Sequence, residues 1–294
     1  MLYVCADDYG LSEESVRHID TCIACGGLNK ISIFPNGMQK NVKDKFEEEK
    51  PFLCLHINLV EGAPVGTAEN MKLLVSDTGE FKHSFFGLLL LSLSPKRKEF
   101  EKQLYEELCA QLRYGNAHFS ENGVLSVDSH QHVHMIPLVF RTLMRAIRDE
   151  KITVNYLRYP AEPIMPYLKT PSLFLTYRPI SLVKQWLLKL FGMINKKELK
   201  QSGIKTAYFM GILFSGHMDK KRVLKVLPHY LALARKNKRD VEILLHPGYE
   251  EKGVGFKKKF YKFYFSSGRK IEFDCVTDPE FKNITKEACE HAVH

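Results

Sequence analysis

Short apolar segments alternate with helix-forming segments along the chain, and this alternation restricts the fold more than any other feature. Segments 2–6, 30–34 and 52–56 have the length and composition of buried strands, and candidate helices separate them. Further strands are predicted at 124–127, 153–157, 207–210 and 241–245. Strands that alternate with helices favour a parallel sheet. We therefore expect an α/β protein, and we find no internal repeat or linker that would divide it into two domains.

The candidate helices differ in how clearly the sequence marks them. Residues 95–114 form the clearest pattern, because apolar side chains recur there at four-residue steps on one face. Other helices are expected at 12–25, 38–50, 138–150, 182–191 and 219–236, the last interrupted by Pro228. The pattern weakens at 67–94 and 161–205, which we expect to be irregular insertions. Residues 1–282 then form the domain and residues 283–294 a C-terminal tail.

Polar residues stand at the ends of five predicted strands. They come from distant parts of the chain: Asp7, Asp8, His56, His130, Arg158 and His246. The carboxyl ends of parallel strands share one edge of an α/β sheet, where ligand sites are built. We therefore expect these residues to converge on one pocket.

Three histidines, His130, His132 and His134, alternate directly after the apolar run 124–127. In an extended backbone such alternation places side chains on one side, so at least two imidazoles can converge. For any single histidine, packing or helix capping is the alternative. One aspartate and two histidines leave coordination positions open for water and substrate, as in catalytic metal sites.

The two neighbouring carboxylates are suited to two tasks, since one can bind a cation while the other accepts a proton. A bound ion lowers the pKa of water and polarises a carbonyl group. A general acid is needed to expel a poor leaving group such as an amine, and His246 is the candidate. The residues alone therefore predict a metal-dependent hydrolase without specifying its substrate.

The net charge is +9, from 43 Lys and Arg against 34 Asp and Glu, which nucleic acid or a membrane surface would match. Much of this charge lies in clusters at 96–98, 196–197 and 257–259 that are typical of solvated faces. Segment 256–269 interleaves lysine with aromatic residues, and we interpret it as an amphipathic cover of the sheet rather than a base-stacking surface. We therefore expect neither nucleic acid nor a membrane as a partner.

Seven cysteines, an odd number, favour reduced thiols over a disulfide framework. Cys22 and Cys25 have CxxC spacing, but they lie in a helical pattern without a second pair, so we interpret them as core residues. The first strand leaves no room for a signal peptide, and the apolar run near 85–91 is shorter than the roughly 20 residues that cross a bilayer. We expect a soluble cytoplasmic protein.

Four ordered motifs resemble those of the YdjC-like carbohydrate deacetylases, a family that includes chitooligosaccharide deacetylases and hopanoid-biosynthesis members. The motifs are ADDYGLS at 6–12, LHINL at 55–59 with Glu61 and Gly62, DSHQHVH at 128–134 through Pro137, and HPG at 246–248. Segment 268–279 resembles the C-terminal pattern of the family. The resemblance covers residues 2–282.

The resemblance implies a distorted (β/α) TIM-like barrel that removes acetyl from an N-acetylated carbohydrate with a divalent metal ion, usually Mg²⁺. By the same resemblance, Asp7 accepts the proton of the attacking water, and the metal ligands are Asp8, His56 and His130. It further implies a homodimer.

The remaining candidate residues are assigned to the substrate. His132 and His134 would line the pocket or support the ligands. Arg158 would hold a hydroxyl or acidic group of the sugar.

Two points stay open at the level of sequence. Zn²⁺, Co²⁺ and Mn²⁺ suit one aspartate and two histidines as well as Mg²⁺ does, and segment 161–205 matches no family pattern, so the ion and the substrate length are undetermined. The alternatives are a metal-dependent hydrolase of another amide or ester and a non-catalytic barrel that binds sugar or nucleic acid. The intact set Asp7, Asp8, His56 and His130 favours catalysis.

Overall fold

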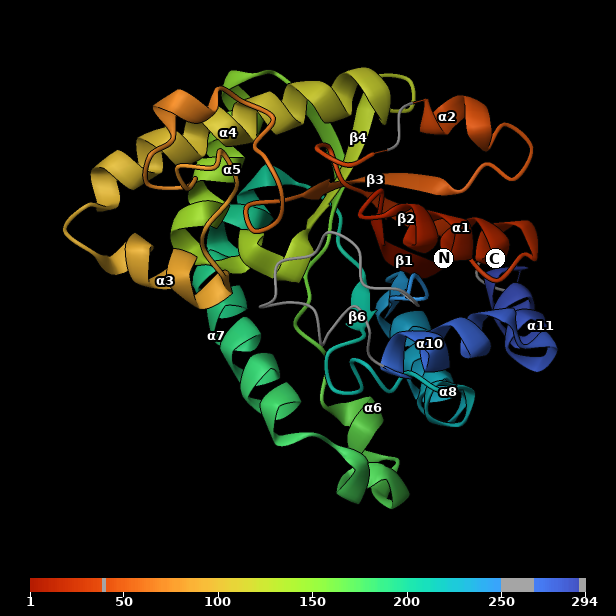
Figure 1. Cartoon of the computed structure of the whole chain (residues 1–294). Coiled ribbons are helices and arrows are strands. Elements are labelled where there is room, and N and C mark those ends of the chain that lie inside the picture. The colour runs from red at the N-terminus through yellow and green to blue at the C-terminus, as the bar shows by residue number, and fades with distance from the viewer. Residues whose placement is uncertain (39–40, 250–266, 291–294) are drawn as a thin grey trace.

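Seven parallel strands form a single sheet in the order β5-β4-β3-β2-β1-β7-β6. The computed structural model describes residues 1–38, 41–249 and 267–290 (Figure 1). The strands are β1 (Leu2–Tyr9), β2 (Lys30–Ile33), β3 (Phe52–Ile57), β4 (Val124–Ser129), β5 (Thr153–Leu157), β6 (Tyr208–Met210) and β7 (Val241–Leu245). The predicted α/β class with a parallel sheet is confirmed.

The sheet curls towards a barrel. Just before β6, the backbone of Lys205 exchanges hydrogen bonds with Asn155 and Leu157 of β5, at 3.1 and 3.0 Å. Across the interior, the Tyr156 hydroxyl of β5 donates to Glu242 of β7. The described residues thus form a curled seven-stranded sheet, consistent with the distorted barrel we expected but not a full eight-stranded TIM barrel.

Helices cover the outside of the curled sheet (Figure 1). Helices α1 and α11 pack on β1, α4 packs on β3 and β4, and α8 and α10 pack on β7. The α-helices are α1 (Glu13–Ala24), α2 (Val42–Lys45), α3 (Phe85–Leu93), α4 (Arg97–His118), α5 (Pro137–Asp149), α6 (Met165–Leu168), α7 (Pro179–Ser202), α8 (Lys220–Asn237), α10 (Ser267–Thr277) and α11 (Pro279–Glu290). Short 3₁₀ segments are η1 (Ala68–Asn70), η2 (His130–Met135) and η3 (Pro171–Thr176).

Several predicted helices need correction. The helix expected at 38–50 shrinks to the single turn α2, because three glutamates at 47–49 would have opposed the dipole at its C-terminal end. Helix α8 runs without interruption through Pro228. Residues 283–290 are not a tail but part of α11, which buries Phe281, Thr285 and Ala288.

The two segments expected to be irregular contain regular helices. Segment 67–94 contains η1 and α3, and segment 161–205 contains the 24-residue helix α7. The sequence hid the true length of α7 because its buried face mixes Ser181, Gln185 and Asn195 with Leu188 and Phe191, whereas many of its apolar residues are exposed. The usual apolar stripe on the inner face is therefore missing.

Two further expectations concern thiols and membranes. All seven cysteines are free thiols, as predicted, and Cys22 is buried in α1. Cys25, also expected in the core, is only half-buried at the C-cap of this helix. Within the described part of the chain, no helix combines the length and the apolar composition that crossing a bilayer requires. Most of the predicted cover at 256–269 lies outside the described residues.

Candidate functional site

Strand β1 ends in two neighbouring carboxylates that point to different partners. The pairing of β1 with β2 shifts register between Ala6 and Tyr9, and Asp8 has a φ of 68°, a left-handed conformation uncommon for a residue with a side chain. The bulge breaks the regular alternation of the strand. Asp7 therefore binds Arg158, whereas Asp8 binds His130 and Arg269.

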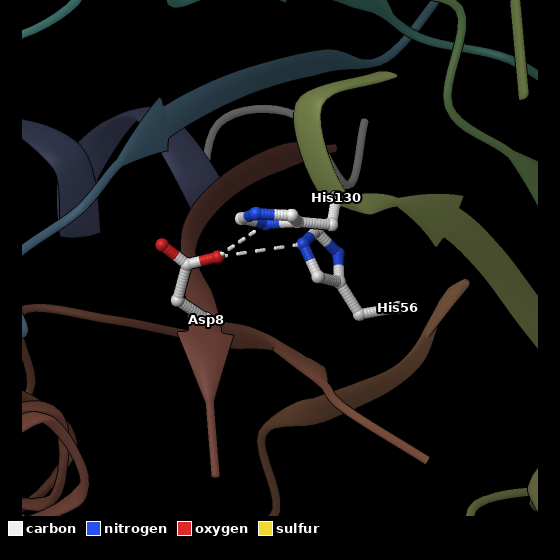
Figure 2. Close-up of side chains that lie close together, drawn as sticks. All are labelled: Asp8, His56 and His130. Carbon is white, nitrogen blue, oxygen red and sulfur yellow. Dashed lines mark hydrogen bonds and ion pairs between the residues drawn. The ribbon is translucent and has the colours of Figure 1, made fainter. Parts of the chain in front are cut away.

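Asp8, His56 and His130 converge at the carboxyl ends of three strands (Figure 2). The Oδ1 atom of Asp8 lies 2.9 Å from Nδ1 of His130 and 3.6 Å from Nε2 of His56. All three side chains are buried, and one ligand atom of each lies within 4.8 Å of the others. The structure thus brings together the three residues predicted as metal ligands, in an arrangement that could hold one metal ion.

The orientation of His56 supports this interpretation. Its Nδ1 atom lies 2.6 Å from Oδ1 of Asp128, so Nδ1 donates and Nε2 faces the other two residues. Nε2 is buried and has no hydrogen-bond partner among the described residues, which is costly unless a ligand binds there. The donor set therefore fits a divalent ion.

The electrostatic surroundings also favour a cation. Burial alone would lower the pKa of His56, but Asp7 and Asp128 raise it to about 10. Burial alone would raise the pKa of Asp8, but Arg269 and His130 hold it well below its usual value. Groups that attract a proton to His56 would attract a metal ion to the same place.

Asp7 is held rigidly beside this cluster. The guanidinium of Arg158 donates to both carboxylate oxygens, at 2.7 and 2.8 Å, in a bidentate pair. The nearer Asp7 oxygen lies 3.9 Å from Nε2 of His56. Asp7 therefore presents a fixed carboxylate next to the point where the three candidate ligands meet.

This geometry corrects the role predicted for Arg158. Its side chain is fully buried, and its nitrogens also bind Asp128 and Glu242, at 2.8 Å each. Lys30 extends the network from β2 with a 3.0 Å ion pair to Glu242. Arg158 is therefore enclosed by protein carboxylates and is not exposed to a sugar.

The histidine segment folds differently from the extended strand that we assumed. Gln131 and His132 adopt left-handed conformations, with φ of 52° and 59°, within η2. The ring of His134 therefore turns inward and binds the Ser129 hydroxyl and the Arg158 carbonyl, at 2.5 and 2.9 Å, so its predicted place in the pocket is wrong. His132 does line the pocket, and within the described part of the chain its buried Nδ1 atom has no hydrogen-bond partner.

A small cavity opens over the cluster, and several of the predicted site residues line it. Its lining includes Asp7, Asp8, His130, His132, Lys184 and His246. Glu272 of α10 positions His246. The Glu272 carboxylate accepts a 2.5 Å hydrogen bond from the backbone nitrogen of His246 and lies 3.4 Å from Nδ1 of the His246 ring. The cavity thus faces the predicted acid, the predicted base and two of the three predicted ligands, whereas His56 lies beneath it, fully buried.

Several residues of the site were not predicted. Lys30 and Glu242 are charged residues inside otherwise apolar strands, which is a recognisable signal for a buried ion pair. Arg269 lies in the C-terminal motif, but its contact with Asp8 spans 261 residues. Lys184 of α7 also lines the cavity, and burial lowers the pKa of its amine.

The fold and the site define a parallel α/β protein with an acidic, histidine-rich pocket at the carboxyl ends of its strands. The family model for YdjC-like proteins matches residues 1–287. The chain therefore belongs to the YdjC-like family.

Curated relatives carry a common description. A carbohydrate deacetylase from Danio rerio is 32% identical over 167 residues, which cover 55% of this chain and 50% of that protein. A carbohydrate deacetylase from Mus musculus is 28% identical over 262 residues, which cover 84% of this chain and 78% of that protein. The match thus spans half the length of the Danio rerio relative.

A solved structure shares the fold. A protein from Enterococcus faecalis, described as a candidate cellobiose-phosphate cleavage protein, superposes with a TM-score of 0.65 over 99% of this chain and 94% of its own. The two sequences are 17% identical, so this likeness concerns the architecture alone.

Proposed function

We propose that this protein is a metal-dependent hydrolase that removes acetyl from an N-acetylated carbohydrate. The observation that carries the proposal is the convergence of Asp8, His130 and the Nε2 atom of His56, which accepts or donates no hydrogen bond among the described residues, beside the fixed carboxylate of Asp7. The names of the curated relatives support a carbohydrate substrate.

Asp8, His56 and His130 would hold the ion. When bound, it would polarise the acetyl carbonyl and lower the pKa of a water molecule. Asp128 keeps Nε2 of His56 available for the ion by accepting from Nδ1. Mg²⁺ is the ion that family resemblance implies, but Mg²⁺ prefers oxygen ligands, and the two nitrogen donors also suit Zn²⁺, Co²⁺ or Mn²⁺.

The protein's own groups handle the protons. Asp7 accepts the proton of the attacking water, and its pair with Arg158 fixes the direction of both carboxylate oxygens. His246 faces the same cavity and donates a proton to the departing amine of the sugar. Glu272 holds His246 in place for this step.

Acetate release tests the proposal. The substrates are N-acetylglucosamine, di-N-acetylchitobiose and longer oligomers, each with metal-stripped protein and after addition of Mg²⁺, Zn²⁺, Co²⁺ or Mn²⁺. We expect acetate only with metal. Asp7→Asn should lower kcat by about 10²–10⁴-fold while metal still binds, because it removes the base and not a ligand.

The matched control is Asp77→Asn, an exposed aspartate far along the chain from the site, which should leave kcat unchanged. Metal binding without acetate release from any substrate would favour the alternative, a hydrolase of another amide or ester. An unchanged rate in Asp7→Asn would overturn the assignment of the base.

A further inference from the structure

The segment between β5 and β6, residues 161–205, exposes apolar side chains at high density. We call it the α6–α7 arm. Of the 17 large apolar side chains exposed in the described part of the chain, eleven lie in this arm. They include Leu175, at 101% exposure, and Trp186, at 65%. Monomers seldom expose so much apolar surface in one place, and such a surface marks an interaction site.

The α6–α7 arm is also strongly basic. It contains eight lysines and arginines but only two acidic residues, so it contributes six of the nine net positive charges of the chain. One of the acidic residues, Glu162, is buried and accepts hydrogen bonds from the backbone nitrogens of Gly211, Ile212 and Leu213. It adds no acidic group to the surface.

Apolar and basic side chains are arranged side by side on α7. Leu182, Trp186 and Met193 are exposed, and their spacings of four and seven residues place them on one side of the helix. Lys189, Lys196 and Lys200 are exposed along an edge of that apolar stripe. An apolar face flanked by lysines, with tryptophan on it, is typical of helices that lie in the surface layer of a membrane.

We propose that the α6–α7 arm binds the surface of an anionic lipid bilayer. A second copy of the chain is a poorer occupant, because two arms would bring six net positive charges against six others. An anionic bilayer matches both the charge and the apolar stripe. This proposal replaces the expectation of no membrane partner, and it concerns binding at the surface and not insertion across it.

The position of the arm relates this surface to the site. In Figure 1 α6 and the first turns of α7 extend away from the sheet, at the bottom of the view. Lys184 of the same helix lines the cavity over Asp7 and Asp8. Because Lys184 is two positions away from Leu182 and from Trp186, a bilayer bound to the apolar stripe would lie on the side of α7 opposite the cavity.

Trp186 offers a direct test, because it is the single tryptophan of the chain. We would titrate the full chain with vesicles of phosphatidylcholine alone and of phosphatidylcholine with phosphatidylglycerol. We expect a blue shift of the Trp186 emission and co-sedimentation with the anionic vesicles, both weakened by salt. The readout needs no turnover, so it is independent of the proposed activity.

Two variants identify the surface. Lys189→Gln/Lys196→Gln/Lys200→Gln should weaken vesicle binding on the order of 100-fold, since each lysine near an anionic surface contributes roughly a factor of five. Leu175→Ser/Leu182→Ser should reduce the blue shift of Trp186. The matched control, Lys43→Gln/Lys236→Gln/Lys286→Gln, removes the same charge from exposed sites on α2, α8 and α11 and should bind nearly as well as the wild type.

Three outcomes would overturn the proposal. The first is no binding to anionic vesicles. The second is equal loss of binding in both lysine variants, which would show attraction by overall charge alone. The third is a dimer in sedimentation velocity that Leu182→Ser dissociates, with Trp186 already blue-shifted in the absence of lipid, because a second copy would then cover the arm.

Discussion

Proteins usually expose charged side chains and bury apolar ones. The interior of the curled sheet departs from this rule by burying charged side chains, whereas the α6–α7 arm departs from it by exposing apolar side chains. The interior buries Lys30, Arg158 and Glu242 almost completely, whereas the arm exposes Leu175 and Trp186. Buried charges need partners, and the interior supplies them at distances near 3 Å. The exposed apolar groups of the arm have no such partner within the described structure.

The comparison shows that buried charges must be balanced by other groups inside the fold, whereas exposed apolar side chains need not be. Arg158 and Lys30 bring two positive charges into the interior, and Asp7, Asp128 and Glu242 bring three negative ones. A proton or a metal ion at His56 would balance the remaining negative charge. The charge balance of the interior thus leaves a place for an additional cation, while the apolar groups of the arm would be covered by the bilayer we propose.

The largest effect is expected from removing the common cation of the interior. Arg158→Met would leave Asp7, Asp128 and Glu242 buried without it, and should lower the free energy of unfolding by about 3–5 kcal/mol. Urea denaturation followed by circular dichroism would measure this. Arg145→Met is the control, because its pair with Asp149 is about half exposed, and it should change the free energy by about 0–1 kcal/mol. Similar losses of unfolding free energy in Arg158→Met and Arg145→Met would show that the buried network contributes no more to stability than an exposed ion pair.

The second largest effect should come from acid, which should protonate Glu242 and so lower the free energy of unfolding. Burial alone would raise the pKa of Glu242, but Arg158 and Lys30 lower it to about 2. Because this value lies below the ordinary 4.5, the contribution of Glu242 to stability is complete above about pH 4.5 and is lost as the pH falls towards 2. The urea midpoint should therefore fall across this range. Glu242→Gln should be less stable at neutral pH but should show a flatter acid dependence, and parallel curves would contradict the assignment.

The contrast between the strands of the sheet and the apolar surface of the α6–α7 arm also explains how far the sequence predicts the fold. The strands were recognisable because most of their residues are buried and apolar. Four of the six polar residues predicted at their ends, Asp7, Asp8, His130 and His246, do line one pocket. Helix α7 was largely missed, since its exposed face is more apolar than a solvated helix should be. Sequence periodicity assumes an apolar interior and a polar exterior, and the arm breaks this assumption.

Within the site, the sequence predicted which residues lie together better than it predicted where their side chains point. Asp8, His56 and His130 do lie together, but Arg158 and His134 turn into the interior and not towards the cavity. The left-handed backbone at Gln131 and His132 breaks the alternation from which His134 was placed. The contacts of Lys30 with Glu242 and of Asp8 with Arg269 join residues more than 200 positions apart, which no local pattern could reveal.

A smaller effect is expected where the interior meets the proposed ion. Asp128→Asn would weaken the acceptor that orients His56, and should lower metal affinity by about 10–100-fold. Isothermal titration with Zn²⁺ and Mg²⁺ would measure it. The control is Asp149→Asn, an exposed carboxylate on α5, which should leave the affinity unchanged. Equal affinities in wild type and Asp128→Asn would show that His56 needs no such support.

The smallest effect should come from the arm, and one helix provides both the test and its control. Leu182 and Leu188 lie on different faces of α7, with exposures of 48% and 1%. Leu182→Ala should change the free energy of unfolding by less than about 0.5 kcal/mol, because it removes little buried surface. Leu188→Ala should cost about 2–5 kcal/mol, because it leaves a cavity beneath the helix. Urea denaturation of both variants in the absence of lipid would show whether the apolar face of α7 serves the fold. A loss in Leu182→Ala as large as that in Leu188→Ala would mean that the protein itself covers this face, and the arm would then have no surface to offer a partner.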